Sequence, residues 1–175
     1  GLVGSEMCIR DRPLPDIFKD RQKKDYVKMN YDNISKGFTP AFIQQLQCSI
    51  HPDHAWWNRE SHFNHDNEAR CSAFLEMEGG VPDQFCLSFY SDILPPVVCN
   101  KFGALGWIPT ITLTTHIRQL PTTAEVYADF KATDINKGYF EQDCNIWDLN
   151  ANLVASSRQL TRILKSEDKL SHNTN

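Results

Sequence analysis

VPDQFCLSFYSDILPPVV (residues 81–98) is the stretch that decides the fold, because it predicts a helix with a clear beginning and end. Pro82 and Asp83 suit a first helical turn, where a missing N–H group is tolerated and a negative charge is favoured. The apolar residues that follow recur at helical spacing. A pair of prolines then ends the helix near Leu94, because proline cannot continue the helical hydrogen bonding.

One side of this predicted helix carries Phe85, Phe89 and Asp92 at positions i, i+4 and i+7. The adjacent positions are also mostly apolar, namely Cys86, Tyr90 and Ile93. A helix this short and this apolar is expected to be buried on more than one side. Asp92 is then carried toward the core, where a carboxylate is rare unless it has a partner or a function.

After the helix, the apolar residues alternate with polar ones, which is typical of strands with one buried face. TITLTTHIRQL (110–120) and AEVYADFKAT (124–133) both show this pattern. Their apolar positions are Ile111, Leu113 and Ile117 in the first, and Val126, Ala128, Phe130 and Ala132 in the second. Two further strands, 138–149 and 152–164, are joined by the turn-forming residues DLNAN.

Two strands are also predicted before the helix, at residues 38–50 and 71–79, with a long polar loop at 51–68 between them. The order is therefore two strands, one helix and a four-strand meander. This is the order expected of an α+β hotdog fold, in which an antiparallel sheet wraps around one central helix. The domain spans 38–164, after a linker or arm at 13–37 and before a polar tail at 165–175.

The bulk composition excludes several classes of protein. Of the 175 residues, 41% are hydrophobic and 23% charged, which is typical of one globular domain rather than a disordered chain. The formal net charge of −4 argues against a broad nucleic-acid-binding face. No apolar run approaches the roughly 20 residues that cross a bilayer.

Cysteine and histidine suggest metal binding only weakly. Apart from Cys8, the five cysteines are widely spaced and form no C-x-x-C pair, which favours reduced, buried thiols in an intracellular, cytoplasmic protein. The segments HPDH (51–54) and HFNH (62–65) have carboxylates nearby, but a zinc site needs a third and a fourth ligand with firm spacing. We therefore predict no metal and no cofactor.

The first twelve residues, GLVGSEMCIRDR, do not fit the rest of the chain. One legal back-translation of them resembles a sequencing-library adapter that ends in a transposase mosaic end. We therefore interpret residues 1–12 as derived from an adapter and leave them out of the domain.

Four stretches in the same order resemble the acyl-CoA thioesterases of the double-hotdog, type II kind. They are FTPAFIQQLQ (38–47), FYSDILPP (89–96), WIPTITLTTHIR (107–118) and GYFEQDCNIWDLNANLVASSRQL (138–160). The resemblance implies hydrolysis of acyl-CoA. It also implies a catalytic trio of Asp92, Thr110 and Gln159, which in that family holds and activates the attacking water.

The residues themselves support part of this assignment. Burial and the negative end of the helix dipole would both raise the pKa of Asp92 above about 3.9, which makes a better base. Gln159 shares a strand face with Leu153, Ala155 and Ile163, so its amide is expected to point inward. The alternatives are a solvent-facing Asp92, a Gln159 that satisfies a buried backbone group, and a Thr110 that is merely a strand residue. Trp147-Asp148 is expected to be structural, with the carboxylate accepting turn N–H groups.

The chain departs from that family in one respect, because it has one helix-plus-meander set whereas the family has two. We therefore expect a missing N-terminal hotdog or a homodimer mate as the partner, and a fragment that dimerises or precipitates and hydrolyses acyl-CoA poorly. One rival is a non-catalytic acyl-binding or structural hotdog half. A hotdog hydratase or dehydratase is the other, disfavoured because no histidine lies between His65 and His116.

Overall fold

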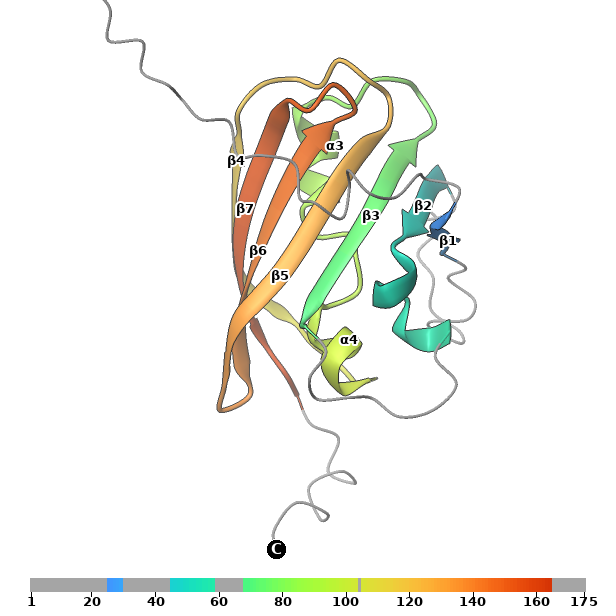
Figure 1. Cartoon of the computed structure of the whole chain (residues 1–175). Coiled ribbons are helices and arrows are strands. Elements are labelled where there is room, and N and C mark those ends of the chain that lie inside the picture. Colours follow the sequence, from blue (N-terminus) through green and yellow to red (C-terminus); the bar gives the residue numbers. More distant parts are fainter. Residues whose placement is uncertain (1–24, 30–44, 59–67, 104, 165–175) are drawn as a thin grey trace, which may run out of the picture.

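The computed structural model describes residues 25–29, 45–58, 68–103 and 105–164. Within them, seven strands form one antiparallel sheet in the order β1-β2-β3-β5-β6-β7-β4 (Figure 1). The strands are β1 (Val27–Lys28), β2 (Leu46–Ile50), β3 (Arg70–Met77), β4 (Thr110–Ile117), β5 (Val126–Asn136), β6 (Tyr139–Asp148) and β7 (Leu153–Arg162). The helices are α3 (Gln84–Tyr90) and α4 (Val98–Phe102), with 3₁₀ turns η3 (Pro52–His54) and η4 (Trp56–Asn58).

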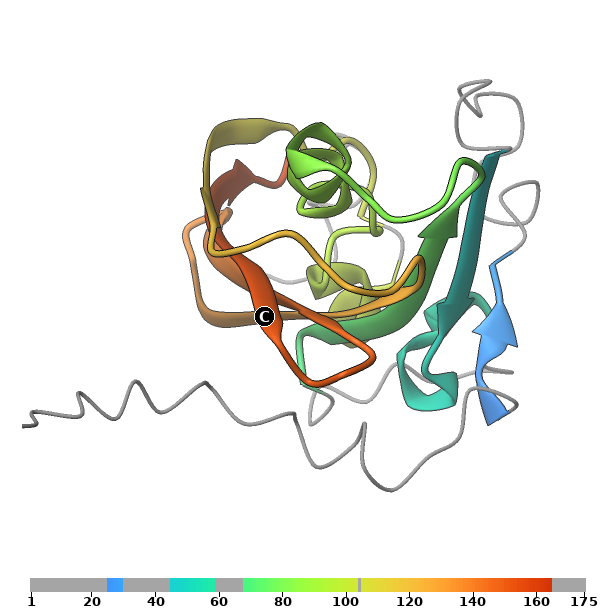
Figure 2. The same cartoon turned by 90° about the horizontal axis from the view of Figure 1, so that it is seen from above.

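The sheet is curved, and both helices lie on its concave side (Figure 2). Leu87 and Tyr90 of α3 have no exposed surface and join the main core with the inward side chains of the strands. The α+β architecture predicted from the sequence, an antiparallel sheet wrapped around a helix, is therefore confirmed. Among the described strands, β4, which follows this helix, lies at one edge of the sheet and pairs with β7.

Helix α3 is shorter than predicted and buries a different side. Asp83 is its N-cap and accepts the Cys86 N–H at 2.8 Å, but the helix ends at Tyr90 rather than near Leu94. Phe85 is 74% exposed, so the predicted inward side was wrong at that position. The buried side runs through Leu87 and Tyr90 instead. Helix α4, which follows the two prolines, has five residues and is too short to show a period.

Three predicted inward positions also differ. Ile111 and Ile117 of β4 are 49% and 37% exposed. Ile111 is the extra residue at a register irregularity, and β4 is an edge strand with one neighbour among the described strands. Leu153 lies on the outer face instead of sharing the Gln159 side, because a register shift at Ile146/Trp147 reverses the alternation at the start of β7. The inward positions Val126, Ala128, Phe130 and Ala132 of β5 are buried as predicted.

The outer face of the sheet carries its own apolar cluster. Tyr26, Phe74, Tyr127 and Trp147 are buried there, and Leu153 packs against them. Tyr26 lies next to β1, inside the segment predicted to be a linker or arm, and β1 pairs with β2. The predictions for residues 1–12, for 13–24 and 30–37 of the arm, for 38–44 of the first strand and for the tail from 165 fall outside the described residues.

Candidate active site

The structure brings the three predicted site residues together. The Gln159 Nε2 group donates to Asp92 Oδ1 at 2.7 Å and also to Thr110 Oγ1. Thr110 Oγ1 is itself 3.5 Å from Asp92 Oδ1. These residues are separated by 67, 49 and 18 positions in the sequence, so the contact is a product of the fold.

Asp92 is placed by the end of helix α3. It is the second residue after the helix, and its N–H donates to the Phe89 carbonyl at 3.1 Å. The preceding Ser91 is buried, donates to the Ser88 carbonyl at 2.7 Å, and lies 2.9 Å from Thr115 Oγ1 on β4. Because the Ser91 proton is used on Ser88, Thr115 is the donor in the second contact. These bonds hold the end of α3 against the strand that carries Thr110.

Thr110 owes its direction to an irregularity in β4. It pairs with Thr161 on β7, whereas Thr112 pairs with Leu160, so Ile111 is an extra residue in β4. Without this bulge, Thr110 would lie on the opposite face from Leu113, since side chains alternate along a strand. With the bulge, both lie on the face of Gln159. The pattern TITL contains no sign of it.

Gln159 is buried at 6% exposure in the middle of β7, as predicted for an inward amide. Its register partner on β6 is Gln142, whose Nε2 group donates to Gln159 Oε1 at 3.0 Å. The Gln142 Oε1 atom in turn accepts the Val97 N–H at 3.3 Å. Gln142 was not among the residues predicted from the sequence. Its place between Phe140 and Cys144, which are both buried, marks it as an inward position but does not identify its contacts.

A cavity of about 440 Å³ opens beside these groups. Its polar wall consists of Asp92, Thr110, Gln142, Gln159 and Thr161. Its apolar wall consists of Leu94, Pro96, Trp107, Ile108, Pro109 and Phe140. The combination of a mostly apolar space with a few convergent polar groups is typical of a small-molecule site.

The surroundings of Asp92 raise the pKa of its carboxyl group. The residue as a whole is exposed and lines the cavity, while its Oδ1 atom accepts a hydrogen bond from Gln159. Partial burial raises the pKa of this carboxyl, and the hydrogen bonds from Gln159 and Thr110 lower it, but burial prevails and the pKa lies above the ordinary value. A weak acid with a raised pKa is a stronger base once it ionises.

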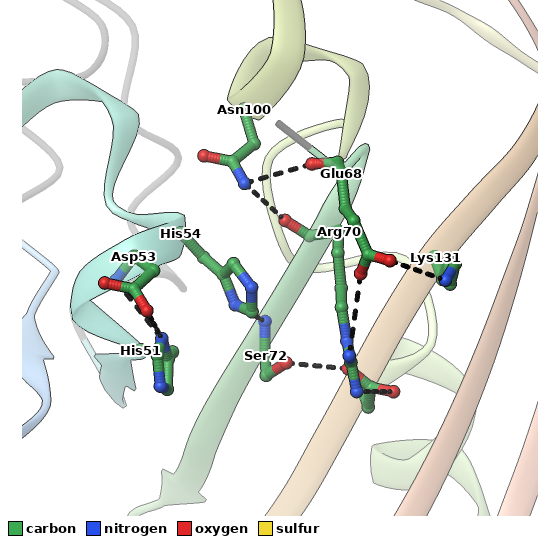
Figure 3. A network of polar contacts seen from close by, with 9 residues as sticks. His51, Asp53, His54, Glu68, Arg70, Ser72, Asn100 and Lys131 are labelled. Atoms are coloured by element: carbon green, nitrogen blue, oxygen red, sulfur yellow. Dashed lines mark hydrogen bonds and ion pairs between the residues drawn. The ribbon is translucent and has the colours of Figure 1, made fainter. Parts of the chain in front are cut away.

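The histidine pairs do not form a metal centre within the described residues, where no group of three or more potential ligands occurs. His51 Nδ1 accepts the Asp53 N–H at 3.1 Å, and His54 Nδ1 accepts the Ser72 N–H at 3.0 Å (Figure 3). Each imidazole therefore accepts a hydrogen bond from a backbone N–H group, His51 from one in η3 and His54 from one in β3. His62 and His65 lie outside the described residues. The five described cysteines are all free, and four of them are buried.

Asp148 has the structural role that the sequence predicted. Its Oδ1 atom accepts the N–H groups of Asn150 and Asn152 in the turn, at 3.0 and 2.9 Å. Its Oδ2 atom accepts from Thr122 and from the Asn152 side chain. Burial raises the pKa of Asp148, but these bonds outweigh it and hold the pKa below its ordinary value.

Three solved structures resemble this chain in fold. A protein from Thermobifida fusca, provisionally assigned as a thioesterase II, matches 88% of this chain and 55% of its own, with a TM-score of 0.67 and 21% identity. A hotdog protein of unknown function from Alicyclobacillus acidocaldarius matches 89% and 56%, with a TM-score of 0.64 and 21% identity. A provisionally assigned thioesterase from Novosphingobium aromaticivorans matches 83% and 53%, with a TM-score of 0.59 and 16% identity.

These likenesses confirm the hotdog fold, and the chain spans about half the length of the three structures it matches. No curated protein sequence matches it. A family model described as the acyl-CoA thioesterase C-terminal domain matches residues 19–163, which is most of the chain. The chain therefore belongs to the acyl-CoA thioesterase C-terminal domain family.

Proposed function

We propose that this domain hydrolyses acyl-CoA thioesters with a water molecule activated by Asp92, Thr110 and Gln159. The observation that carries the proposal is the contact of the Gln159 amide with both Asp92 and Thr110 in the wall of a partly apolar cavity. The family supports thioester chemistry, and the cavity offers space for an acyl group beside the three polar side chains.

In this mechanism, the Asp92 carboxylate removes a proton from water while the water oxygen attacks the thioester carbonyl carbon. Thr110 and Gln159 hold the carboxylate and the water in line by hydrogen bonds. The tetrahedral intermediate collapses with cleavage of the C–S bond. The proton on Asp92 then passes to the departing thiolate, so the products are a carboxylic acid and free coenzyme A.

The two rival functions make different use of the same residues. A non-catalytic acyl-binding half would keep the cavity without needing a base, whereas Asp92 has a carboxyl whose pKa is raised beside two donors. A hydratase of this fold would use a histidine beside an acid. Among the described residues, the cavity walls offer a carboxylate, two hydroxyls and two amides, which fits water activation better.

We further propose that a second hotdog unit docks on this one, supplied by a longer chain or by another copy. Met77, Phe85, Cys86 and Phe89 form an open apolar hollow of about 590 Å³ on and beside α3. In the part of the chain that the structure describes, β4 lies at the end of the sheet, with one strand neighbour and two exposed isoleucines. Exposed apolar patches and strand edges are both typical of interaction sites.

The test of the hydrolase function is the release of free thiol from acyl-CoA by Asp92→Asn compared with wild type. If Asp92 is the general base, kcat should fall at least about 100-fold with little change in KM. The matched control is Asp134→Asn, which removes an exposed carboxylate on β5 outside the cavity and should leave the rate unchanged. A variant at Asp92 that hydrolyses at the wild-type rate would refute the assignment, and acyl-CoA binding without turnover would favour the acyl-binding half.

A further inference from the structure

Four groups form a continuous chain of hydrogen bonds that runs from the core to the candidate base. The Val97 N–H donates to Gln142 Oε1 at 3.3 Å, and Gln142 Nε2 donates to Gln159 Oε1 at 3.0 Å. Gln159 Nε2 then donates to Asp92 Oδ1 at 2.7 Å. Both glutamines are buried, at 5% and 6% exposure, so water does not compete freely for these bonds.

The direction of this chain is fixed at its inner end. A carboxamide can turn by half a revolution and exchange its oxygen for its nitrogen, but a backbone N–H can only donate. Val97 therefore requires the oxygen of Gln142, which leaves the Gln142 nitrogen for Gln159. Gln159 must then present its oxygen to Gln142 and its nitrogen to Asp92.

A reversed Gln159 would impair the site. Its oxygen would face the Asp92 carboxylate and the Thr110 hydroxyl, so Asp92 would lose its closest donor. A carboxylate that faces an acceptor is disfavoured, and one hydrogen bond to a charged group contributes more than a bond between neutral groups. The proposed catalysis by Asp92, Thr110 and Gln159 therefore depends on whatever holds the Gln159 amide in its observed direction.

We propose that Gln142 is a positioning residue that keeps the Gln159 amide turned with its NH₂ group toward Asp92. The expected effect on the rate of hydrolysis rests on the proposed function. The direction of the Gln159 amide does not, because it can be tested without hydrolysis. Gln142 acts through Gln159, which stands between it and Asp92 in the chain of hydrogen bonds. Neither the periodicity of β6 nor the resemblance to the thioesterases assigns it a role.

A purely structural role is the competing explanation, because Gln142 also ties the loop after α3 to the sheet through Val97. Asn100 provides the matched control. Its side chain is buried at 3% exposure and ties α4 to the sheet by donating to the Glu68 and Arg70 carbonyls at 3.2 and 3.1 Å (Figure 3). Like Gln142, Asn100 is a buried amide that hydrogen-bonds to the backbone, but its hydrogen bonds do not connect to Asp92.

Three variants separate the two roles, with thiol release measured across pH. Gln142→Met removes both bonds and should lower kcat about five- to tenfold, the effect of about one lost hydrogen bond, with little change in KM. Gln142→Glu keeps an acceptor for Val97 but, once ionised, forces Gln159 to turn its nitrogen inward. Its kcat should be about 100-fold low on the alkaline plateau, as for a lost donor in an active site. Asn100→Leu should lower thermal stability and leave the plateau kcat unchanged.

At acid pH the carboxyl group introduced by Gln142→Glu is neutral and carries an O–H group, which can replace the donor of the native amide. The ratio of the Gln142→Glu rate to the wild-type rate should therefore rise toward one as pH falls, provided that ¹³C NMR shows this carboxyl titrating. Charge repulsion alone would delay the ionisation of Asp92 but restore the full rate on the plateau. A wild-type plateau in Gln142→Glu, with the introduced carboxyl ionised, would overturn the proposal, as would equal losses of kcat in Gln142→Met and Asn100→Leu.

One test uses the wild-type chain alone and does not require a measurement of hydrolysis. In the wild-type chain with ¹⁵N-labelled glutamine, the Gln159 side-chain NH₂ signals should shift as the Asp92 carboxyl titrates, because they face it. Absence of that shift would show a reversed amide and overturn the inference. If the shift is present but no thioester is hydrolysed, the proposed function fails while the positioning role stands.

Discussion

At the scale of single residues, the candidate site combines one carboxyl group, that of Asp92, with two hydrogen-bond donors that lower its pKa. Burial raises the pKa of Asp92, while Gln159 and Thr110 lower it. The ionised form needed to accept a proton is therefore reached at a higher pH than for an exposed aspartate, whose pKa is about 3.9.

This balance predicts the acid limb of the pH profile. If Asp92 is the general base, as proposed, kcat/KM of the wild-type chain should rise with pH through an apparent pKa above that of an exposed aspartate, because the proposed mechanism requires the Asp92 carboxylate. Thr110→Val removes a donor to that carboxylate, so the limb should move to higher pH and the plateau rate should fall. The measurement is thiol release from acyl-CoA from about pH 4 to about pH 9, a range that spans the ionisation of a perturbed carboxyl. A limb that is the same in Thr110→Val would mean that Thr110 does not interact with the ionising group.

The three predicted site residues and the one that was not predicted differ in the information needed to identify them. Asp92, Thr110 and Gln159 could be named because they stand in short stretches that resemble a known family. Gln142 could not, because its role depends on Val97, 45 positions away, and on its partner across the β6–β7 pair. The alternation of β6 indicates that Gln142 points inward, but not what it contacts.

At the scale of elements, the sequence patterns predicted the strands more accurately than the end of the helix. The alternation in residues 124–133 correctly predicted the inward side of β5, since successive side chains of a regular strand point to opposite faces. Periodicity fails where the backbone is irregular, as at the bulge around Ile111 and the register shift before Leu153. It also misplaced the end of α3, because the prolines set only a latest possible end for the helix.

The turn between β6 and β7 provides a prediction about stability. Because the pKa of Asp148 is lowered in the folded state, its contribution to stability is present above about pH 4 and is lost as pH falls through the folded-state pKa. Asp148→Asn should lower the free energy of unfolding by about 2 kcal/mol near neutral pH, since two donors then face an NH₂ group. The difference should shrink at low pH, as measured by urea denaturation at several pH values.

Asp143→Asn is the control for that experiment. It removes a carboxylate that pairs with Arg158 at 2.7 Å on the surface, where both side chains are largely exposed. Exposed pairs contribute less than about 1 kcal/mol. A loss from Asp143→Asn as large as that from Asp148→Asn would show that general charge effects, rather than the turn, account for the result.

At the scale of the whole molecule, the two faces of the sheet are completed differently. The outer face has its own buried cluster around Trp147, to which Tyr26 contributes. The concave face is filled by α3 and α4, yet α3 leaves Phe85 exposed, and β4 has one strand neighbour. Among the described residues, no strand pairs with the outer edge of β4, and Phe85 stays 74% exposed. No helix among them is long and apolar enough to cross a bilayer.

The arrangement predicts that the 175-residue chain associates with itself or precipitates when no second hotdog unit is present. Phe85→Glu places a charge in the hollow formed with Met77 and Phe89, so it should shift the chain toward monomer because burying that carboxylate in an interface is costly. Leu149→Glu is the matched control, since Leu149 is 40% exposed in the β6–β7 turn and does not line the hollow. The measurement is the molar mass by light scattering after size-exclusion chromatography. A wild-type chain that stays monomeric at high concentration would contradict the proposed docking surface, and so would a Phe85→Glu variant that associates as strongly as Leu149→Glu.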